Sequence, residues 1–173
     1  MLAHSMEMAQ RGWHGVAVVL ISACASAPTD GSVERVAHAE VVEVIDGDTI
    51  RARISDTIET IRLVGIDTPE TKHPTKGVQC FGPQATAFVT RLLPVGTTVR
   101  IERDAEARDS YGRLLLYVFR SNNGQEIFVN HEIVLRGFAR PLNIEPNSRY
   151  HAQFVAAAFA AQHDARGLWA RCK

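Results

Sequence analysis

The feature that most limits the fold is a run of alternating apolar and polar residues from Glu40 to Asp67, EVVEVIDGDTIRARISDTIETIRLVGID. β-Branched residues recur throughout it, and alternation with a period of two is typical of strands that bury one face. The segments DGD and SDT interrupt the run with residues that favour tight turns. The run therefore predicts three successive strands joined by two turns.

The remainder of the chain predicts two more strands and three helices. The segment GPQATAFVTRLLPVG has the apolar spacing of a helix, and TTVRIERD and GRLLLYVFR predict the fourth and fifth strands. NHEIVLRG predicts a short helix with Asn130 as its N-cap, and a last helix is expected over about residues 148–166. Five short strands with a helix between the third and fourth predict an α+β fold, an OB-type five-stranded barrel with about three α-helices outside it.

The N-terminal residues predict export. Arg11 precedes the apolar stretch GVAVVLISACASA, which is shorter than the ~20 residues of a membrane span and suits a signal peptide. ISAC, ending at Cys24, has the form of a lipoprotein cleavage site that would make Cys24 a lipid anchor, whereas ASA is a site for ordinary signal peptidase, and both remain open. A buried N-terminal helix is the non-export alternative. We expect residues 1–24 to be the signal, 25–38 a flexible linker and 39–173 one domain.

The charge balance excludes a protein that binds nucleic acid through an overall positive charge. Lys plus Arg and Asp plus Glu both total 19, so no overall positive field attracts a polyanion, and any such contact requires locally placed cations.

If Cys24 is removed or acylated, Cys80 and Cys172 remain, either as a disulfide or as two separate thiols. There is no CxxC pair and the seven histidines lack ligand spacing, so no zinc site is expected.

Acidic residues gather in two motifs, VIDGDT and GIDTPE. Asp46 and Asp48 flank a glycine, a pattern that often serves only to bond the local backbone of a turn. Asp67 is expected to end the third strand, with Glu70 close behind it. If the first and third strands are neighbours, Asp48 and Asp67 converge at one rim of the barrel. Two carboxylates with a backbone carbonyl and water suit a hard cation, Ca²⁺ in preference to Mg²⁺.

Two arginines complete the candidate site. Arg62 interrupts the apolar run TIRLVGID, and Arg113 opens the fifth strand. A guanidinium binds two phosphate oxygens at once, so Arg62 and Arg113 could clamp a phosphodiester while Glu70 positions or deprotonates the attacking water. The alternative for each arginine is a structural ion pair with a neighbouring acid.

The chain resembles the staphylococcal nuclease (thermonuclease) family in five motifs that occur in the same order. These are VIDGDT, RLVGIDTPETKHP, KGVQCFGPQA, DSYGRLLLYV and VNHEIVLRGFA, and the resemblance extends from about Val42 to the GLW at 167–169. It implies an OB-fold barrel with three helices that hydrolyses DNA and RNA with calcium, single-stranded or denatured substrates being preferred. Cleavage at the phosphorus–O5′ bond would leave 3′-phosphorylated products.

The resemblance also implies a role for individual residues. Asp48, Asp67 and the backbone carbonyl of Thr68 match calcium ligands, and Arg62, Glu70 and Arg113 match the catalytic positions. Tyr111, Lys72 and Lys76 match residues that line the nucleotide pocket. QCFG together with a cysteine after GLW matches exported members, which implies a Cys80–Cys172 disulfide.

Three departures from the family pattern concern the substrate. Asn143 and Glu145 stand where the archetype has tyrosines near the base, and Ser110 replaces a lysine at the pocket rim. The neutral charge implies weaker non-specific binding with a shallower salt dependence. Two rival functions are a catalytically inactive nuclease-like module that binds nucleic acid or protein, and a structural lipoprotein. A monomer is the expected oligomeric state.

Overall fold

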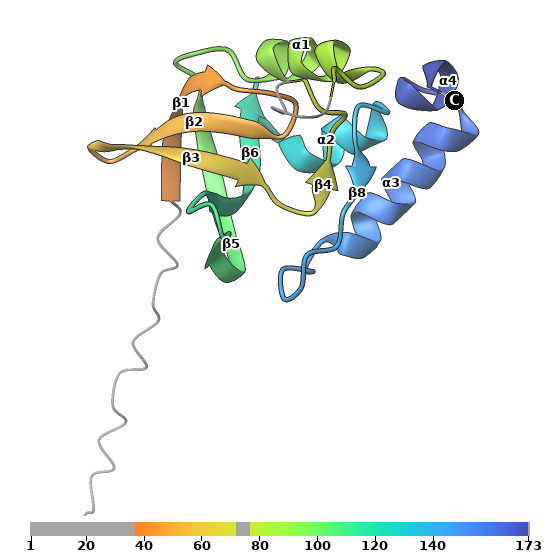
Figure 1. Ribbon diagram of the computed structural model, residues 1–173. Coiled ribbons are helices and arrows are strands. Elements are labelled where there is room, and N and C mark those ends of the chain that lie inside the picture. Colours follow the sequence, from red (N-terminus) through yellow and green to blue (C-terminus); the bar gives the residue numbers. More distant parts are fainter. Residues whose placement is uncertain (1–36, 72–76, 173) are drawn as a thin grey trace, which may run out of the picture. The chain divides into compact units, whose positions relative to one another are not determined.

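The computed structural model describes residues 37–71 and 77–172, all of which belong to one compact unit, residues 34–173 (Figure 1). The predicted export signal, most of the linker and Cys24 lie outside the described residues. Among the described residues, no helix combines the length and apolar character needed to cross a bilayer.

The alternating run forms an antiparallel meander of β1 (Ala37–Val44), β2 (Thr49–Ile54) and β3 (Thr57–Leu63). The third strand ends earlier than expected. Gly65 has a φ of 84°, a conformation that favours glycine, and it turns the chain so that Ile66–Asp67 forms a separate strand, β4. A Cβ on Gly65 would lie 2.3 Å from the ring of Phe154, so the close packing also requires glycine.

Two long strands close the meander into a barrel. β5 (Thr98–Arg108) pairs with β1, and β6 (Leu114–Asn122) pairs with β5. Parallel pairing of β3 with β6, in the register Ile61↔Leu114, completes the ring. The five-stranded OB-type barrel of the α+β class is therefore confirmed. β7 (Gln125–Phe128) extends β6, and β8 (Arg140–Pro141) pairs with β4; neither was predicted.

In the described ranges, 37–71 and 77–172, four helices accompany the barrel. α1 (Gly82–Leu92), α2 (Val129–Leu135) and α3 (His151–His163) correspond to the three predicted helices, and α4 (Leu168–Arg171) is a further single turn. The α2 and α3 helices pack against each other, and side chains from both extend the barrel core.

The prediction that Asn130 caps α2 is wrong. The helix begins one residue earlier and makes no side-chain capping bond, while Asn130 is completely buried in its first turn. Asn130 Oδ1 accepts from Val118 N at 3.0 Å, and its Nδ2 donates to Val64 O at 2.9 Å. Because buried backbone groups require partners, the barrel wall uses this amide where its ladder is interrupted.

Aromatic side chains fill the space between the barrel and α3. Tyr117, Phe128, Tyr150 and Phe154 form edge and tilted ring contacts with centroid separations of 4.6–6.3 Å. The Tyr117 hydroxyl donates to Asp104 Oδ2 at 2.7 Å, so the polar end of this buried ring is satisfied. This packing holds α3 against the barrel, and Phe154 also lies against Gly65 at the start of the GIDTPE motif.

Candidate active site

The pairing of β2 with β3 brings the two acidic motifs together. Thr49 lies opposite Arg62, so Asp48, at the start of β2, is adjacent to Arg62, and Leu63 N donates to Asp48 O at 2.8 Å. β1 and β3 are not neighbours, because β2 separates them in the sheet order. The expected convergence therefore occurs through a different strand pair from the one considered in the sequence.

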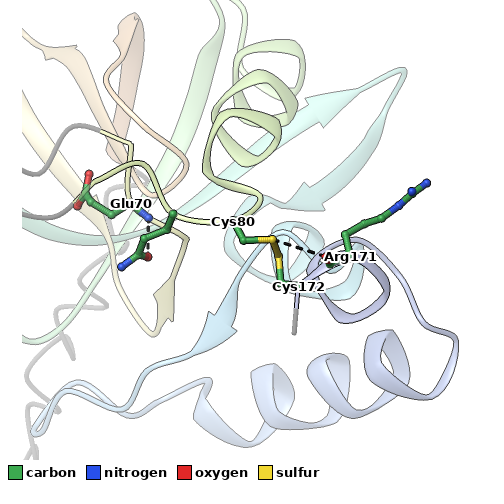
Figure 2. The surroundings of a disulfide bond; sticks show 5 residues. Glu70, Cys80, Arg171 and Cys172 are labelled. Atoms are coloured by element: carbon green, nitrogen blue, oxygen red, sulfur yellow. Dashed lines mark hydrogen bonds between the residues drawn. A yellow bond between two sulfur atoms is a disulfide. The ribbon is translucent and has the colours of Figure 1, made fainter.

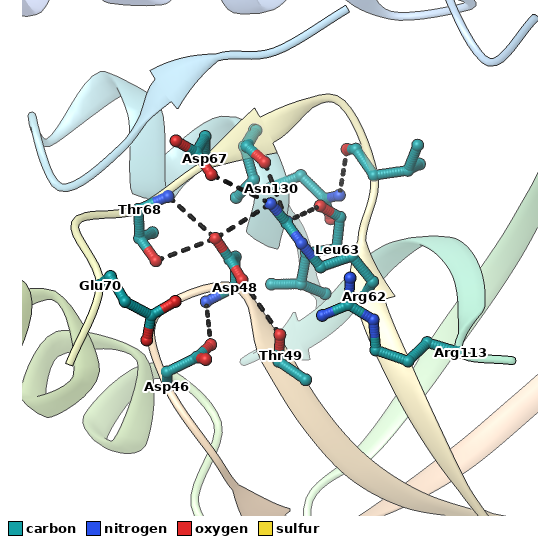
Figure 3. Close-up of polar contacts among 12 residues, drawn as sticks. Asp46, Asp48, Thr49, Arg62, Leu63, Asp67, Thr68, Glu70, Arg113 and Asn130 are labelled. Carbon is teal, nitrogen blue, oxygen red and sulfur yellow. Dashed lines mark hydrogen bonds and ion pairs between the residues drawn. The ribbon is translucent and has the colours of Figure 1, made fainter. Parts of the chain in front are cut away.

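Polar side chains from β2, β3, β4 and the segments beside them line one pocket of about 190 Å³ (Figure 3). The pocket contains both predicted carboxylate ligands, Thr68 and all three predicted catalytic residues. Its lining residues are Asp46, Asp48, Thr49, Arg62, Asp67, Thr68, Glu70 and Arg113.

Asp48 is held at the floor of this pocket by several hydrogen bonds. Its Oδ2 accepts from the Thr68 N and Oγ1 at 2.9 and 3.0 Å, and its Oδ1 accepts from Thr49 Oγ1 at 3.0 Å. Gly47 makes the contact with Thr68 feasible, since a Cβ there would lie 2.7 Å from Thr68 Oγ1. The glycine of the DGD motif is thus required by its close approach to Thr68, the residue after β4.

Arg62 crosses between the two acidic motifs with only 7% of its surface exposed. Its Nη1 donates to the carbonyl oxygens of Leu63 and Ile66, both at 2.9 Å. Its Nη2 lies 3.2 Å from Asp48 Oδ2 and 3.3 Å from Asp67 Oδ1. These contacts fix the guanidinium plane at the pocket wall and include the structural ion pairs that the sequence left as the alternative.

Asp67 and Glu70 lie nearer to solvent than Asp48. The side chain of Asp67 is 60% exposed, and Glu70 is partly buried. Glu70 Oε1 accepts a hydrogen bond from Thr71 N at 2.9 Å, which orients the carboxylate from its own loop. Of these three acids, Asp48 is therefore the buried one, and Asp67 and Glu70 are the more accessible ones.

Arg113 comes from the turn before β6 and is oriented by Asp109. Its Nε donates to Asp109 Oδ2 at 2.7 Å, and Asp109 Oδ1 accepts from Arg113 N at 2.9 Å and Tyr111 N at 3.0 Å. Partial burial raises the pKa of Asp109, but the hydrogen bonds from Arg113 outweigh it and hold that pKa below its usual value. Asp109, mentioned in the sequence only as a neighbour of Tyr111, therefore carries a negative charge that fixes Arg113.

Tyr111 is not part of the acidic pocket. Its ring is 84% exposed, and with Leu142 and Ile144 it lines an adjoining pocket of about 460 Å³, which shares Arg62 and Arg113 with the first. The two pockets thus meet at the arginines, one lined by acids and the other partly by apolar side chains.

Asp46 was considered in the sequence only as a turn residue, yet it lines the acidic pocket. Its Oδ1 accepts from Asp48 N at 3.1 Å. Burial, followed by the nearby charge of Asp48, raises the pKa of Asp46 to about 6. The repeated acid of the DGD motif was the only sequence signal for this residue.

The donor set of the pocket fits a hard cation. Among the described residues that line it, the groups able to bind a metal are carboxylate, hydroxyl and carbonyl oxygens, which suit Ca²⁺ or Mg²⁺. In the described part of the chain, no three acidic, histidine or cysteine side chains are grouped closely enough to bind a metal by themselves.

Two lysines and two cysteines complete the set of predicted residues. Lys72 and Lys76 fall within 72–76, outside the described residues. Cys80 and Cys172 form a disulfide with a Cα–Cα distance of 5.8 Å, which joins the segment before α1 to the end of α4 (Figure 2).

Comparison with known proteins identifies the family. Residues 60–171 match the family model described as staphylococcal nuclease homologue. The chain is 37% identical to a thermonuclease of Staphylococcus hyicus over 130 residues, which are 75% of this chain and 74% of that protein. It is 39% identical to a thermonuclease of Staphylococcus intermedius over 131 residues, 76% of this chain and 75% of that protein. Endonuclease YncB of Bacillus subtilis is 32% identical over 149 residues, 85% of this chain and 68% of that protein. The chain therefore belongs to the staphylococcal nuclease family.

Proposed function

We propose that this protein is a calcium-dependent nuclease that hydrolyses phosphodiester bonds of DNA and RNA and leaves 3′-phosphorylated products. The observation that carries the proposal is the single pocket in which Arg62, Glu70 and Arg113 lie together with Asp48, Asp67 and Thr68. The family relatives named thermonuclease and endonuclease support the same class of reaction.

The metal would be held by Asp48, Asp67 and the backbone carbonyl of Thr68. When bound, Ca²⁺ supplies positive charge that neutralises a phosphate oxygen as negative charge accumulates on it. Asp48 is already oriented by Thr49 and Thr68, so little side-chain reorganisation is required.

The two arginines would hold the scissile phosphate. Arg62 and Arg113 line both pockets, so a phosphate at their junction can contact both guanidinium groups while the attached nucleoside enters the adjoining pocket beside Tyr111. Fixed cations stabilise the transition state because they need no rearrangement when its charge develops.

Glu70 would accept a proton from the attacking water. The water oxygen bonds to phosphorus, the bond from phosphorus to O5′ breaks, and O5′ takes a proton from solvent. The products are a 3′-phosphate and a free 5′-hydroxyl. Tyr111, with Lys72 and Lys76 from the segment 72–76, would bind the nucleotide sugar and phosphate.

The protein would act outside the cytoplasm as a monomer. The N-terminal sequence favours export, with membrane attachment through a lipid on Cys24 as one route and free secretion as the other. Extraction of cell envelopes with a detergent that separates lipoproteins, for the protein and for Cys24→Ala, distinguishes the two.

The decisive assay incubates the purified protein with heat-denatured DNA and with RNA, in calcium, in magnesium and with a chelator. Glu70→Gln removes the proton acceptor, and Glu40→Gln is the matched control, since Glu40 lies exposed on β1 outside the pocket. Calcium-dependent cleavage that Glu70→Gln lowers at least ~100-fold and Glu40→Gln leaves intact supports the proposal. Release of phosphate from the new 3′ ends by a phosphatase tests the product.

Binding without cleavage in either metal would instead support the rival reading, a nuclease-like module that binds nucleic acid. Cleavage that persists with chelator would reject the calcium requirement alone.

A further inference from the structure

Two hydrogen bonds join Glu70 to Gln79, nine positions later in the chain. Glu70 N donates to Gln79 Oε1 at 2.9 Å, and Gln79 N donates to Glu70 O at 2.9 Å. The amide and the carbonyl of Glu70 are thus both bound by one residue. Because the peptide groups on either side of Glu70 are fixed, its backbone cannot rotate without breaking one of these bonds.

This restraint extends to the carboxylate. Glu70 Oε1 accepts from Thr71 N at 2.9 Å, so the orientation of the Glu70–Thr71 peptide also determines where the carboxylate lies in the pocket. The Gln79 side chain is therefore connected to the carboxylate of the proposed proton acceptor through two hydrogen bonds and the backbone of Glu70 between them.

Two features restrain the segment that carries Gln79: its contacts with the start of α1 and the neighbouring disulfide. Gly82 N donates to Gln79 O at 3.1 Å, and the start of α1 packs so closely that a Cβ on Gly82 would lie 2.9 Å from Glu70 O. In addition Cys80, the next residue in the chain, is bonded to Cys172 near the C-terminus (Figure 2). The disulfide thus fastens the segment that carries Gln79 to α4.

The exposure of Gln79 argues against a role in the core. The residue is exposed, as is Gln84 on the outer face of α1, and replacement of such a side chain is normally close to neutral for stability. What distinguishes Gln79 is its acceptor oxygen on the Glu70 amide. A large effect on catalysis would therefore have to act through Glu70.

We propose that Gln79 is a positioning residue for Glu70 and that the Cys80–Cys172 disulfide holds Gln79 in its place. The proposal rests on the catalytic role of Glu70 in the proposed nuclease reaction. It assigns a function in the active site to a disulfide that otherwise only ties the C-terminal segment to the domain.

The test measures kcat and KM on a short single-stranded oligonucleotide in saturating calcium, at a temperature where every variant is folded by circular dichroism. Loss of one hydrogen bond that orients the carboxylate predicts that Gln79→Ala lowers kcat about five- to tenfold with little change in KM. Gln79→Glu retains an acceptor oxygen and should recover most of the loss. Gln84→Ala, the matched control, should resemble the wild type.

A double-mutant cycle separates positioning from a general structural effect. If Gln79 acts through Glu70, Gln79→Ala should have almost no further effect in a Glu70→Gln background. The double substitution Cys80→Ser with Cys172→Ser should lower kcat in the same direction while the protein stays folded, and Gln79→Ala should add less to it than to the wild type.

The outcomes that overturn the proposal are distinct from those that overturn the nuclease mechanism. An equal loss from Gln79→Ala with and without Glu70→Gln, or an unchanged kcat in Gln79→Ala, rejects the positioning role while the role of Glu70 stands. A kcat unaffected by the disulfide substitutions rejects the part assigned to the disulfide. Full activity of Glu70→Gln rejects the catalytic role of Glu70, and the positioning role with it.

Discussion

Removal of the disulfide should destabilise the domain mainly through the unfolded state. The bridge joins residues 92 positions apart, and the chain-entropy relation gives about 4.6 kcal/mol at 25 °C for a loop of that length. The packing of α4 should change little, because Leu168 remains buried and its N–H still donates to Gly137 O at 2.8 Å. The double variant Cys80→Ser, Cys172→Ser is therefore expected to lose about 3–5 kcal/mol of unfolding free energy.

Urea unfolding followed by circular dichroism measures this loss, with the reduced wild type as a second route to the same state. A loss of this size lowers the melting temperature by roughly 10–20 °C for a domain of this length. The urea m-value should rise in the double variant, since a chain without the cross-link exposes more surface on unfolding. A loss below about 1 kcal/mol would refute the entropic reasoning, because the loop length alone requires more.

Three further predictions concern single residues. Asn130→Ala removes a buried amide that satisfies backbone groups of the barrel wall. Urea unfolding should therefore show that the free energy of unfolding falls by about 3 kcal/mol. A fall near zero would mean that other groups replace the amide as hydrogen-bond partners. Gly82→Ala places a methyl group 2.9 Å from Glu70 O and should lower kcat about tenfold in the oligonucleotide assay. An unchanged kcat would show that α1 can move away without disturbing Glu70. Partial burial raises the pKa of Asp104, but hydrogen bonds led by the Tyr117 hydroxyl hold it below the usual value. Its stabilisation is therefore complete above the unfolded value of ~3.9 and is lost as the pH falls through the lower folded pKa, so the difference in unfolding free energy between the wild type and Asp104→Asn should shrink below about pH 4.

Much of the barrel could be predicted because its strands follow a simple rule. β1 and β2 bury alternate side chains over part of their length, and the period of two is visible in their letters, whereas β3 ends in three consecutive buried residues. The same pattern fails at Ile66–Asp67, where a positive φ at Gly65 divides one apparent strand into two. Such a break depends on contact with Phe154, which is almost 90 positions away in the sequence, and no local pattern contains it.

The residue types of the candidate site could be predicted, but the hydrogen bonds and ion pairs between them could not. Arg62 was conspicuous because a charged residue interrupts an apolar run, and burial with four polar contacts now explains how it is accommodated. Asp46 could not be separated from an ordinary turn residue, since its raised pKa depends on burial and on Asp48. Gln79 could not be predicted, because its hydrogen bond to the Glu70 amide is not visible in any local sequence pattern.

The parallel pairing of β3 with β6 affects when the candidate active site is completed as the chain folds. Arg62 belongs to β3 and lies opposite Leu115, while Arg113 immediately precedes β6, so the two arginines come together only when β3 and β6 pair. A chain that has formed its N-terminal hairpins possesses Asp48 and Arg62 but lacks the second cation. A shift of one residue in the seam would also turn alternate side chains to the opposite face. Recovery of turnover during refolding should therefore require the β3–β6 pairing, and a chain that lacks this pairing should not cleave nucleic acid.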